Sequence, residues 1–164
     1  VYEPGMVMME TYWAQTNKTV NYTLVLNSQG WLDHQEGSSE SLEYDAQGYL
    51  IQSILGATFK SIVEEGNLVR DETWILSNGT PVLDGVFTRT FFKDKPNTIG
   101  MENQGLPFFG KQNRSPVNRE TYYNPKLELE TSITWQYEYD AQNRIIKSSR
   151  SDIPNTYTKY TYVE

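Results

Sequence analysis

The chain has 164 residues, which is the size of one domain and enough to bury a hydrophobic core, so we expect a single domain over residues 1–164. Its 14 basic and 21 acidic residues give a net charge of −7, which would repel phosphate backbones and argues against a nucleic-acid partner. Cysteine is absent, which excludes disulfides, thiolate catalysis and zinc–thiolate sites, and no run approaches the roughly 18 apolar residues of a transmembrane helix.

The residue usage favours β-structure along the whole chain. Only four alanines occur, whereas β-branched and aromatic residues are abundant. Apolar residues alternate with polar ones in two stretches, from Val20 to Leu26 and from Ile133 to Tyr139, as expected for strands with one buried face. Together with the turn signals, this pattern predicts strands near residues 20–26, 31–36, 40–45, 49–55, 58–64, 67–76, 82–92, 129–139, 144–150 and 156–163.

Three short turns between these strands are related in sequence. They start at Asn27, Asp45 and Asp140, and the last two share the run Glu-Tyr-Asp-Ala-Gln. An Asn or Asp side chain can bond the backbone two residues further on, and Gly30, Gly48 or Asn143 can take the positive φ that closes such a loop. Each copy is therefore predicted to be a strand–turn–strand unit.

A long segment, Lys93–Arg119, interrupts the series of strands. It holds three prolines and three glycines and exceeds the roughly 12–15 residues beyond which loops without secondary structure become uncommon. Because it also carries Leu106, Phe108 and Phe109, we expect it to fold back onto the sheet or to plug one end of it. The predicted fold is all-β: an antiparallel meander of about eight to ten strands that forms a curved sheet or a partial or closed barrel.

Several of these segments resemble known bacterial sequences. The run from Tyr137 to Ile145 is similar to the tyrosine–aspartate (YD) repeat of bacterial Rhs-type shell proteins, with Asn143 where that pattern usually has Gly. From about Tyr22 onward the chain resembles a family of secreted bacterial lipoproteins of unknown function with a porin-like fold. The residues that carry this resemblance are the two Tyr-Asp hairpins, Asp94-Lys-Pro-Asn97 and Phe108-Phe-Gly-Lys-Gln112 followed by Asn113.

The resemblance implies a location and a mode of attachment, but no reaction. It implies a soluble, secreted domain of the Gram-negative envelope, in the periplasm or attached to the outer membrane. The domain would be tethered through a lipidated cysteine upstream of Val1, in a leader already removed. The stretch Val1–Thr19 matches nothing in the family.

Signals for catalysis are weak. His34 is the only histidine, and a surface position near a turn accounts for it better than a catalytic role. No nucleophile, metalloprotease, Walker or dinucleotide motif is present, so we expect no enzyme, no catalytic residue, no metal and no cofactor. Paired carboxylates, as in glycosidases, are the remaining catalytic option, and the available acids are Glu64, Glu65, Asp71, Glu72, Asp84 and Asp94.

The sequence supports a ligand-binding site better than a catalytic one. The residues concerned follow the three related turns, where the alternative role is packing between strands. The residues that follow the turn Gly or Asn are Trp31, Tyr49 and Arg144. Their parity is opposite to that of the pairs expected to face the core, which are Leu26 with Leu32, Tyr44 with Leu50 and Tyr139 with Ile145. Aromatic rings beside turn carboxylates suit stacking on sugar rings, so we expect these three residues to form the site if a ligand is bound.

The expected function is thus that of a non-enzymatic envelope domain, a structural or interaction module whose ligand would be a glycan or another small molecule. Two alternatives stay open: a calycin-like carrier of a small hydrophobic ligand, and a glycoside-acting enzyme that uses paired carboxylates.

Overall fold

The computed structural model describes residues 2–3, 5–13, 15, 17–100 and 106–162, and its regular structure there is almost entirely β. The strands form two antiparallel sheets, one of four strands in the order β1-β2-β3-β4 and one of nine strands from β5 to β13 in sequential order. The first sheet comprises β1 (Tyr2–Glu3), β2 (Met6–Trp13), β3 (Lys18–Leu26) and β4 (Leu32–Gln35). The second comprises β5 (Ser41–Tyr44), β6 (Leu50–Leu55), β7 (Ala57–Glu64), β8 (Asn67–Ser77), β9 (Thr80–Phe91), β10 (Val117–Asn124), β11 (Leu129–Tyr139), β12 (Ile145–Arg150) and β13 (Tyr157–Lys159).

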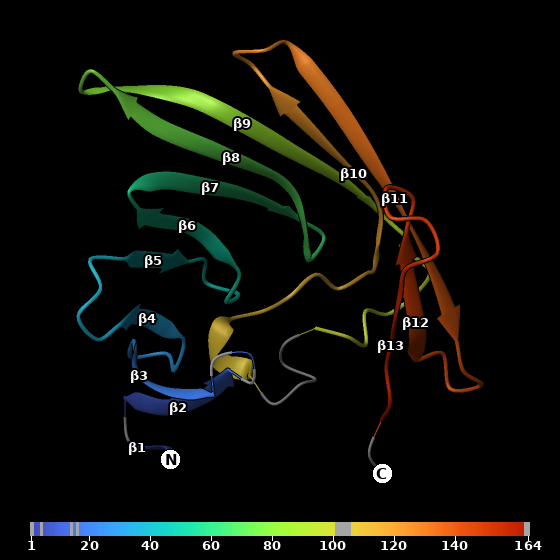
Figure 1. Cartoon of the computed structure of the whole chain (residues 1–164), viewed down its shortest axis with the longest axis horizontal. Coiled ribbons are helices and arrows are strands. Elements are labelled where there is room, and N and C mark those ends of the chain that lie inside the picture. The colour runs from blue at the N-terminus through green and yellow to red at the C-terminus, as the bar shows by residue number, and fades with distance from the viewer. Residues whose placement is uncertain (1, 4, 14, 16, 101–105, 163–164) are drawn as a thin grey trace.

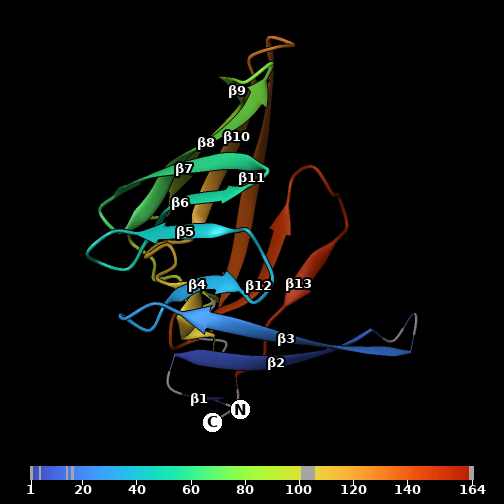
Figure 2. The same ribbon diagram turned by 90° about the vertical axis from the view of Figure 1, so that its left-hand side faces the viewer.

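The two sheets continue each other as one arch. Figure 1 shows the strands curving from β2 and β3 over β8 and β9 to β12 and β13, and Figures 1 and 2 both place β4 beside β5, although no ladder joins these two strands. No ladder pairs β1 with β13 either, so the arch is not closed into a barrel. The all-β antiparallel meander is confirmed. Of the shapes that the sequence allowed, a curved sheet, a partial barrel or a closed barrel, the structure excludes the closed barrel.

Three strands were not predicted from the sequence. β1 and β2 lie in the stretch before residue 19, and β10 begins at Val117, inside the segment expected to be a loop. β10 contains charged and polar residues throughout, and it is a strand because β9 and β11 pair with it on both sides. The described residues therefore hold thirteen strands rather than eight to ten, and the long non-strand segment ends before Val117.

The segment between β9 and β10 lies inside the arch (Figure 1). Its described residues include a 3₁₀ turn, η2 (Pro107–Phe109), and residues 101–105 of the predicted loop lie outside the described part of the chain. Phe108 is only 3% exposed and forms a buried cluster with Val7, Leu24 and Leu32. The expectation that this segment packs onto the sheet through Phe108 is confirmed, and residues 92–116 are called the inner segment below.

Within the described residues, no helix has the length and apolar character needed to cross a membrane.

Candidate functional site

The three related turns have the same hydrogen-bonded geometry. In each, the side-chain Oδ1 of the first residue accepts bonds of 2.9–3.1 Å from the backbone N–H groups two and four residues later. The fourth residue has a positive φ in every copy: 83° at Gly30, 94° at Gly48 and 58° at Asn143. The repeat inferred from the sequence is thus a structural repeat, in which an Asn or Asp side chain organises the turn.

The strand pairs that flank these turns are also equivalent. Each ladder has an irregular register just before the turn, and the pairs that follow are Leu26 with Leu32, Tyr44 with Leu50 and Tyr139 with Ile145. These are the pairs expected from the sequence to face the core. Leu32 and Ile145 are buried, with 7% and 0% exposure.

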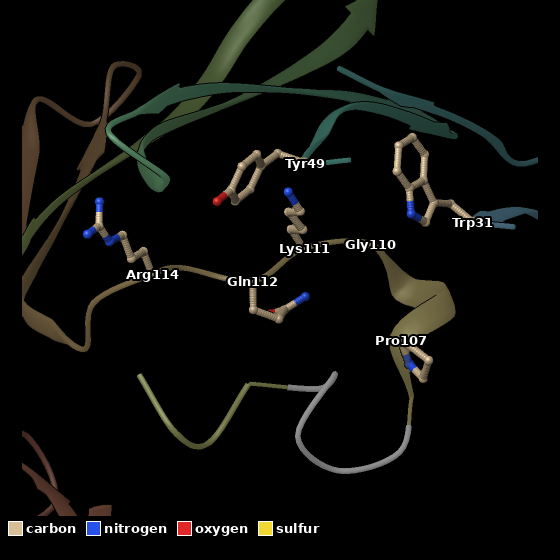
Figure 3. Close-up of a pocket in the computed structure, with 7 residues that line it drawn as sticks. All are labelled: Trp31, Tyr49, Pro107, Gly110, Lys111, Gln112 and Arg114. Carbon is tan, nitrogen blue, oxygen red and sulfur yellow. The ribbon is translucent and has the colours of Figure 1, made fainter. Parts of the chain in front are cut away.

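A pocket opens where two of the turns meet the inner segment (Figure 3). Its volume is about 470 Å³, which lies within the roughly 300–1,000 Å³ of typical small-molecule sites. The pocket is shallow, because most of its residues remain partly or fully exposed. It is lined by Trp31, Tyr49, Pro107, Gly110, Lys111, Gln112 and Arg114. The structure therefore brings together two of the three residues predicted to form a site.

Trp31 is fixed by packing on one side and open to the pocket on the other. Its ring centroid lies 5.4 Å from that of Tyr44, at an angle of 36°. The ring also lies directly over Gly48, where an added Cβ would stand 2.5 Å from Cζ2 of Trp31. Only a glycine can therefore sit under this indole, and the close approach holds the ring in place at the pocket wall.

Tyr49 forms the next part of the wall together with the inner segment. The Nζ atom of Lys111 lies 5.8 Å from the centroid of the Tyr49 ring, within cation–π range. Lys111 and Tyr49 are also joined by an isolated parallel β-bridge. A second cavity of about 320 Å³ lies beyond this pair, lined in part by Phe59, Leu68 and Phe109.

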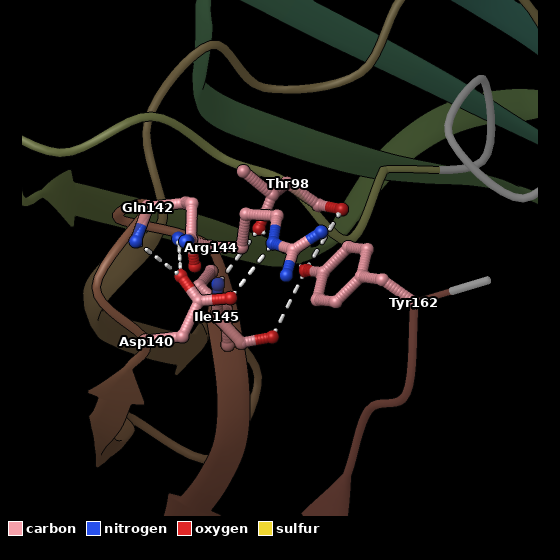
Figure 4. Close-up of polar contacts among 6 residues, drawn as sticks. All are labelled: Thr98, Asp140, Gln142, Arg144, Ile145 and Tyr162. Carbon is pink, nitrogen blue, oxygen red and sulfur yellow. Dashed lines mark hydrogen bonds and ion pairs between the residues drawn. The ribbon is translucent and has the colours of Figure 1, made fainter. Parts of the chain in front are cut away.

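Arg144 does not line this pocket. Its Nε donates a 2.7 Å hydrogen bond to Oδ2 of Asp140, and its guanidinium lies 4.6 Å from the centroid of the Tyr162 ring (Figure 4). The Tyr162 hydroxyl is 2.7 Å from Oγ1 of Thr98, which in turn accepts a bond from the N–H of Ile145. The structure does not bring Arg144 together with the two aromatic residues, because its turn lies against the inner segment at another point, where Asp140 pairs with its charge.

Most of the acids considered for catalysis are engaged by cations. Asp71 pairs with Arg89, Glu72 with Arg70, Glu65 with Lys93 and Asp84 with Lys126. Asp71 lines the second cavity and Asp94 a smaller one beside Tyr139, while none of the six lines the pocket at Trp31. His34 lies next to its own neighbour, with Nδ1 2.9 Å from Oδ2 of Asp33.

The sequence did not identify the pocket residues of the inner segment. Lys111, Gln112 and Arg114 were noted only as part of, or next to, a run that carries a family resemblance. Their approach to Trp31 and Tyr49 depends on backbone contacts between the inner segment and the turns. The sequence does contain one signal that could have identified them. Lys111 and Arg114 closely follow Phe108, Phe109 and Gly110, in a segment that was expected to fold inward.

The chain matches no protein-family model, and no curated protein matches it. Among the solved structures to which it is similar is the crystal structure of a porin-like protein from Bacteroides uniformis ATCC 8492. That similarity has a TM-score of 0.29 and 10% identity, and it covers 95% of this chain and 94% of the other. At so low a TM-score it carries no argument here, and the description of the fold rests on strand order and register. Membership of the porin-like lipoprotein family stays a prediction.

Proposed function

We propose that the chain is a non-enzymatic ligand-binding domain of the bacterial cell envelope, whose site is the pocket between Trp31 and Tyr49 and whose ligand is a carbohydrate. The observation that carries this proposal is that Trp31 and Tyr49 line the same pocket. Two aromatic residues at the same position of successive turns border one pocket, a role that turn formation alone does not require.

Carbohydrate suits the mixture of groups in the wall. The apolar C–H face of a pyranose can lie on an aromatic ring, while its hydroxyl groups need hydrogen-bond partners around the ring. Gln112 supplies both a donor and an acceptor, and Lys111 supplies a donor beside Tyr49. A hydrophobic ligand would leave these polar groups without partners, which disfavours the calycin-like alternative.

A binding role without catalysis is favoured by the state of the acids. Glycosidases need one carboxyl group that can donate a proton and a second that is free to act as nucleophile or base. In this chain Asp71, Glu72 and Glu65 are each held by Arg or Lys, at distances of 2.5–2.9 Å. The hydrogen bonds from Lys93 and Arg70 lower the pKa values of Glu65 and Glu72, which disfavours the protonated form that a general acid needs.

The envelope location rests on the likeness of the Tyr-Asp hairpins to bacterial secreted proteins. Under this proposal the domain is secreted to the periplasm or the outer membrane and tethered by a lipidated cysteine that precedes Val1. Metabolic labelling of the full-length precursor with a fatty-acid analogue tests the tether, and a precursor without a lipidated cysteine contradicts it.

A glycan array, followed by titration calorimetry on the sugars that bind, tests the ligand class. We expect binding to the wild type and at least a tenfold loss in Tyr49→Ala and Trp31→Ala. Trp31→Phe serves as the milder second variant, because it keeps an aromatic ring over Gly48. Melting temperatures, measured alongside, separate lost binding from lost folding.

Arg144→Ala is the matched control, since Arg144 has the equivalent turn position but lies outside the pocket. It should keep wild-type affinity while lowering the melting temperature. If no sugar binds and a fatty acid does, the carrier alternative is correct. If a glycoside is hydrolysed and one Asp or Glu substitution abolishes the activity, the domain is an enzyme.

A further inference from the structure

Two basic side chains of the pocket, Lys111 and Arg114, have no acidic partner among the residues that the structure describes. Seven other basic residues in the described part of the chain pair with carboxylates, for example Arg89 at 2.5 and 2.7 Å and Lys126 at 2.6 Å. Lys18, Lys60, Lys95, Arg119 and Lys159 form no ion pair there either, so what distinguishes Lys111 and Arg114 is that both line one pocket. Within the described part of the chain, no carboxylate oxygen lies at ion-pair distance from Nζ of Lys111 or from the guanidinium of Arg114. The residues described as lining the pocket include no Asp or Glu, although acids outnumber bases by 21 to 14 in the whole chain.

The carboxylate of Glu65 is close enough to Arg114 for an electrostatic interaction, but it is paired with Lys93. Its carboxylate accepts a 2.7 Å hydrogen bond from Nζ of Lys93. The pKa of Glu65 is lowered first by this bond and by the charge of Lys93, and Arg114 contributes less. The charge of Arg114 thus reaches Glu65, but the two residues form no ion pair in the described part of the chain.

Main-chain hydrogen bonds hold the backbone at Lys111 and at Arg114. The N–H of Lys111 donates a 2.7 Å bond to the carbonyl of Gly48, and the N–H of Arg114 donates a 2.8 Å bond to the carbonyl of Gly66. An added Cβ at Gly66 would stand 3.0 Å from the Tyr49 hydroxyl and 3.3 Å from Cβ of Arg114, so the two side chains approach the same turn. Binding would have to order only the ends of these side chains, which reduces its entropic cost.

Both cations line the same pocket as the two aromatic rings. Figure 3 shows Lys111 beside the Tyr49 ring, with Arg114 further along the same segment. We propose that the ligand is an acidic sugar, a short oligosaccharide whose ring carboxylate is held by Lys111 and Arg114 while Trp31 and Tyr49 bind its apolar face. This inference rests on the proposed function.

The guanidinium of Arg114 can donate two parallel hydrogen bonds to the two oxygens of a planar carboxylate, whereas a single ring hydroxyl offers only one oxygen. The net charge of −7 would oppose a long polyanion, which favours a ligand with few charges.

Titration calorimetry with trigalacturonate and with the neutral trisaccharide trigalactose tests the inference, and a sulfated trigalactose distinguishes carboxylate from sulfate recognition. For the wild type at low salt we expect the acidic trisaccharide to bind roughly tenfold tighter than the neutral one, the size of one charge-assisted hydrogen bond. Lys111→Gln and Arg114→Gln should each bring the ratio of the two affinities, acidic over neutral, most of the way to one, and using the ratio removes any change in binding of the neutral sugar from the comparison. Raising the salt concentration should weaken only the acidic ligand.

Lys18→Gln is the control for net charge, because Lys18 is an exposed cation on β3 away from the pocket. It should keep the preference. Both pocket variants retain the backbone bonds to Gly48 and Gly66, and equal melting temperatures would verify this. If the wild type binds both sugars equally, the inference is overturned while the proposed function stands. If it binds neither, both are overturned, and tighter binding of the sulfated sugar rejects the carboxylate.

Discussion

The N–H of Lys111 donates a 2.7 Å hydrogen bond to the carbonyl oxygen of Gly48, and this bond fixes the inner segment to the second Asx turn. Comparable bonds attach the same segment to other turns, from Arg114 to Gly66 and from Ile145 to Thr98. In its described residues the inner segment forms only an isolated bridge, at Lys111, and the N–H groups of Lys111 and Arg114 bond carbonyls of the surrounding turns. The candidate site exists because these bonds hold Lys111 and Arg114 against Tyr49.

Gly48→Ala should destabilise the fold more than Gly79→Ala. Both glycines have a positive φ, 94° and 78°, so both substitutions strain the backbone. Only at Gly48 would the new Cβ collide with an indole, at 2.5 Å from Trp31, whereas nothing lies within 4 Å at Gly79. Chemical denaturation should show that Gly48→Ala costs about 1–3 kcal/mol more than Gly79→Ala. Equal losses would mean that Trp31 is free to move away.

Asp45→Ala should destabilise the second turn, and Asp45→Asn should not. The Oδ1 atom of Asp45 accepts bonds of 2.9 Å from the N–H groups of Gln47 and Tyr49, and alanine would leave both donors without this partner. Asn27 accepts the equivalent pair in the first turn with its amide oxygen. Urea denaturation should give a loss of about 1 kcal/mol for alanine and a smaller one for asparagine. Equal effects would show that the charge of Asp45 matters more than its acceptor.

Phe108→Ala should be severely destabilising. The ring is 3% exposed among Val7, Leu24 and Leu32, so its removal leaves a cavity inside the arch. Denaturation is expected to show a loss of about 3–5 kcal/mol. The control is Leu127→Ala, where the side chain is 70% exposed and the change should stay within about 0.5 kcal/mol. A mild effect at Phe108 would indicate that the inner segment contributes little to folding.

Alkaline pH should destabilise the protein partly through Tyr44. Burial, with the nearby charges of Glu40 and Asp33, raises the pKa of Tyr44 to about 12 from its ordinary value of 10.0. Below pH 10 the phenol is neutral in both states and its contribution is complete. As the pH rises from 10 towards 12, the unfolded chain releases this proton while the folded one keeps it, so stability falls.

Tyr44→Phe should therefore lose less stability than the wild type over that pH range. Denaturation midpoints at stepped pH values measure the difference. Tyr49→Phe is the control variant, because it removes a phenol hydroxyl from another partly exposed tyrosine near the same turn. Parallel curves for Tyr44→Phe and the wild type would contradict a raised pKa at Tyr44.

The sequence by itself determined the β meander and its turns. Alternation marked the strands, and an Asx residue followed by Gly or Asn marked three turns whose hydrogen bonds prove equivalent. Both signals are local, because they depend on backbone geometry over a few residues. The same parity argument identified Leu26 with Leu32 and Tyr139 with Ile145 as paired positions.

Only the tertiary structure decided which turns share a site. Trp31, Tyr49 and Arg144 occupy equivalent positions, yet the inner segment meets the first two turns with Pro107 and Lys111 and the third with Thr98. β10 could not be predicted from local sequence patterns either, because its polar sequence forms a strand only through pairing with β9 and β11. Contacts between residues far apart in the chain depend on the curvature of the arch and on the path of the segment within it, which no short-range pattern encodes.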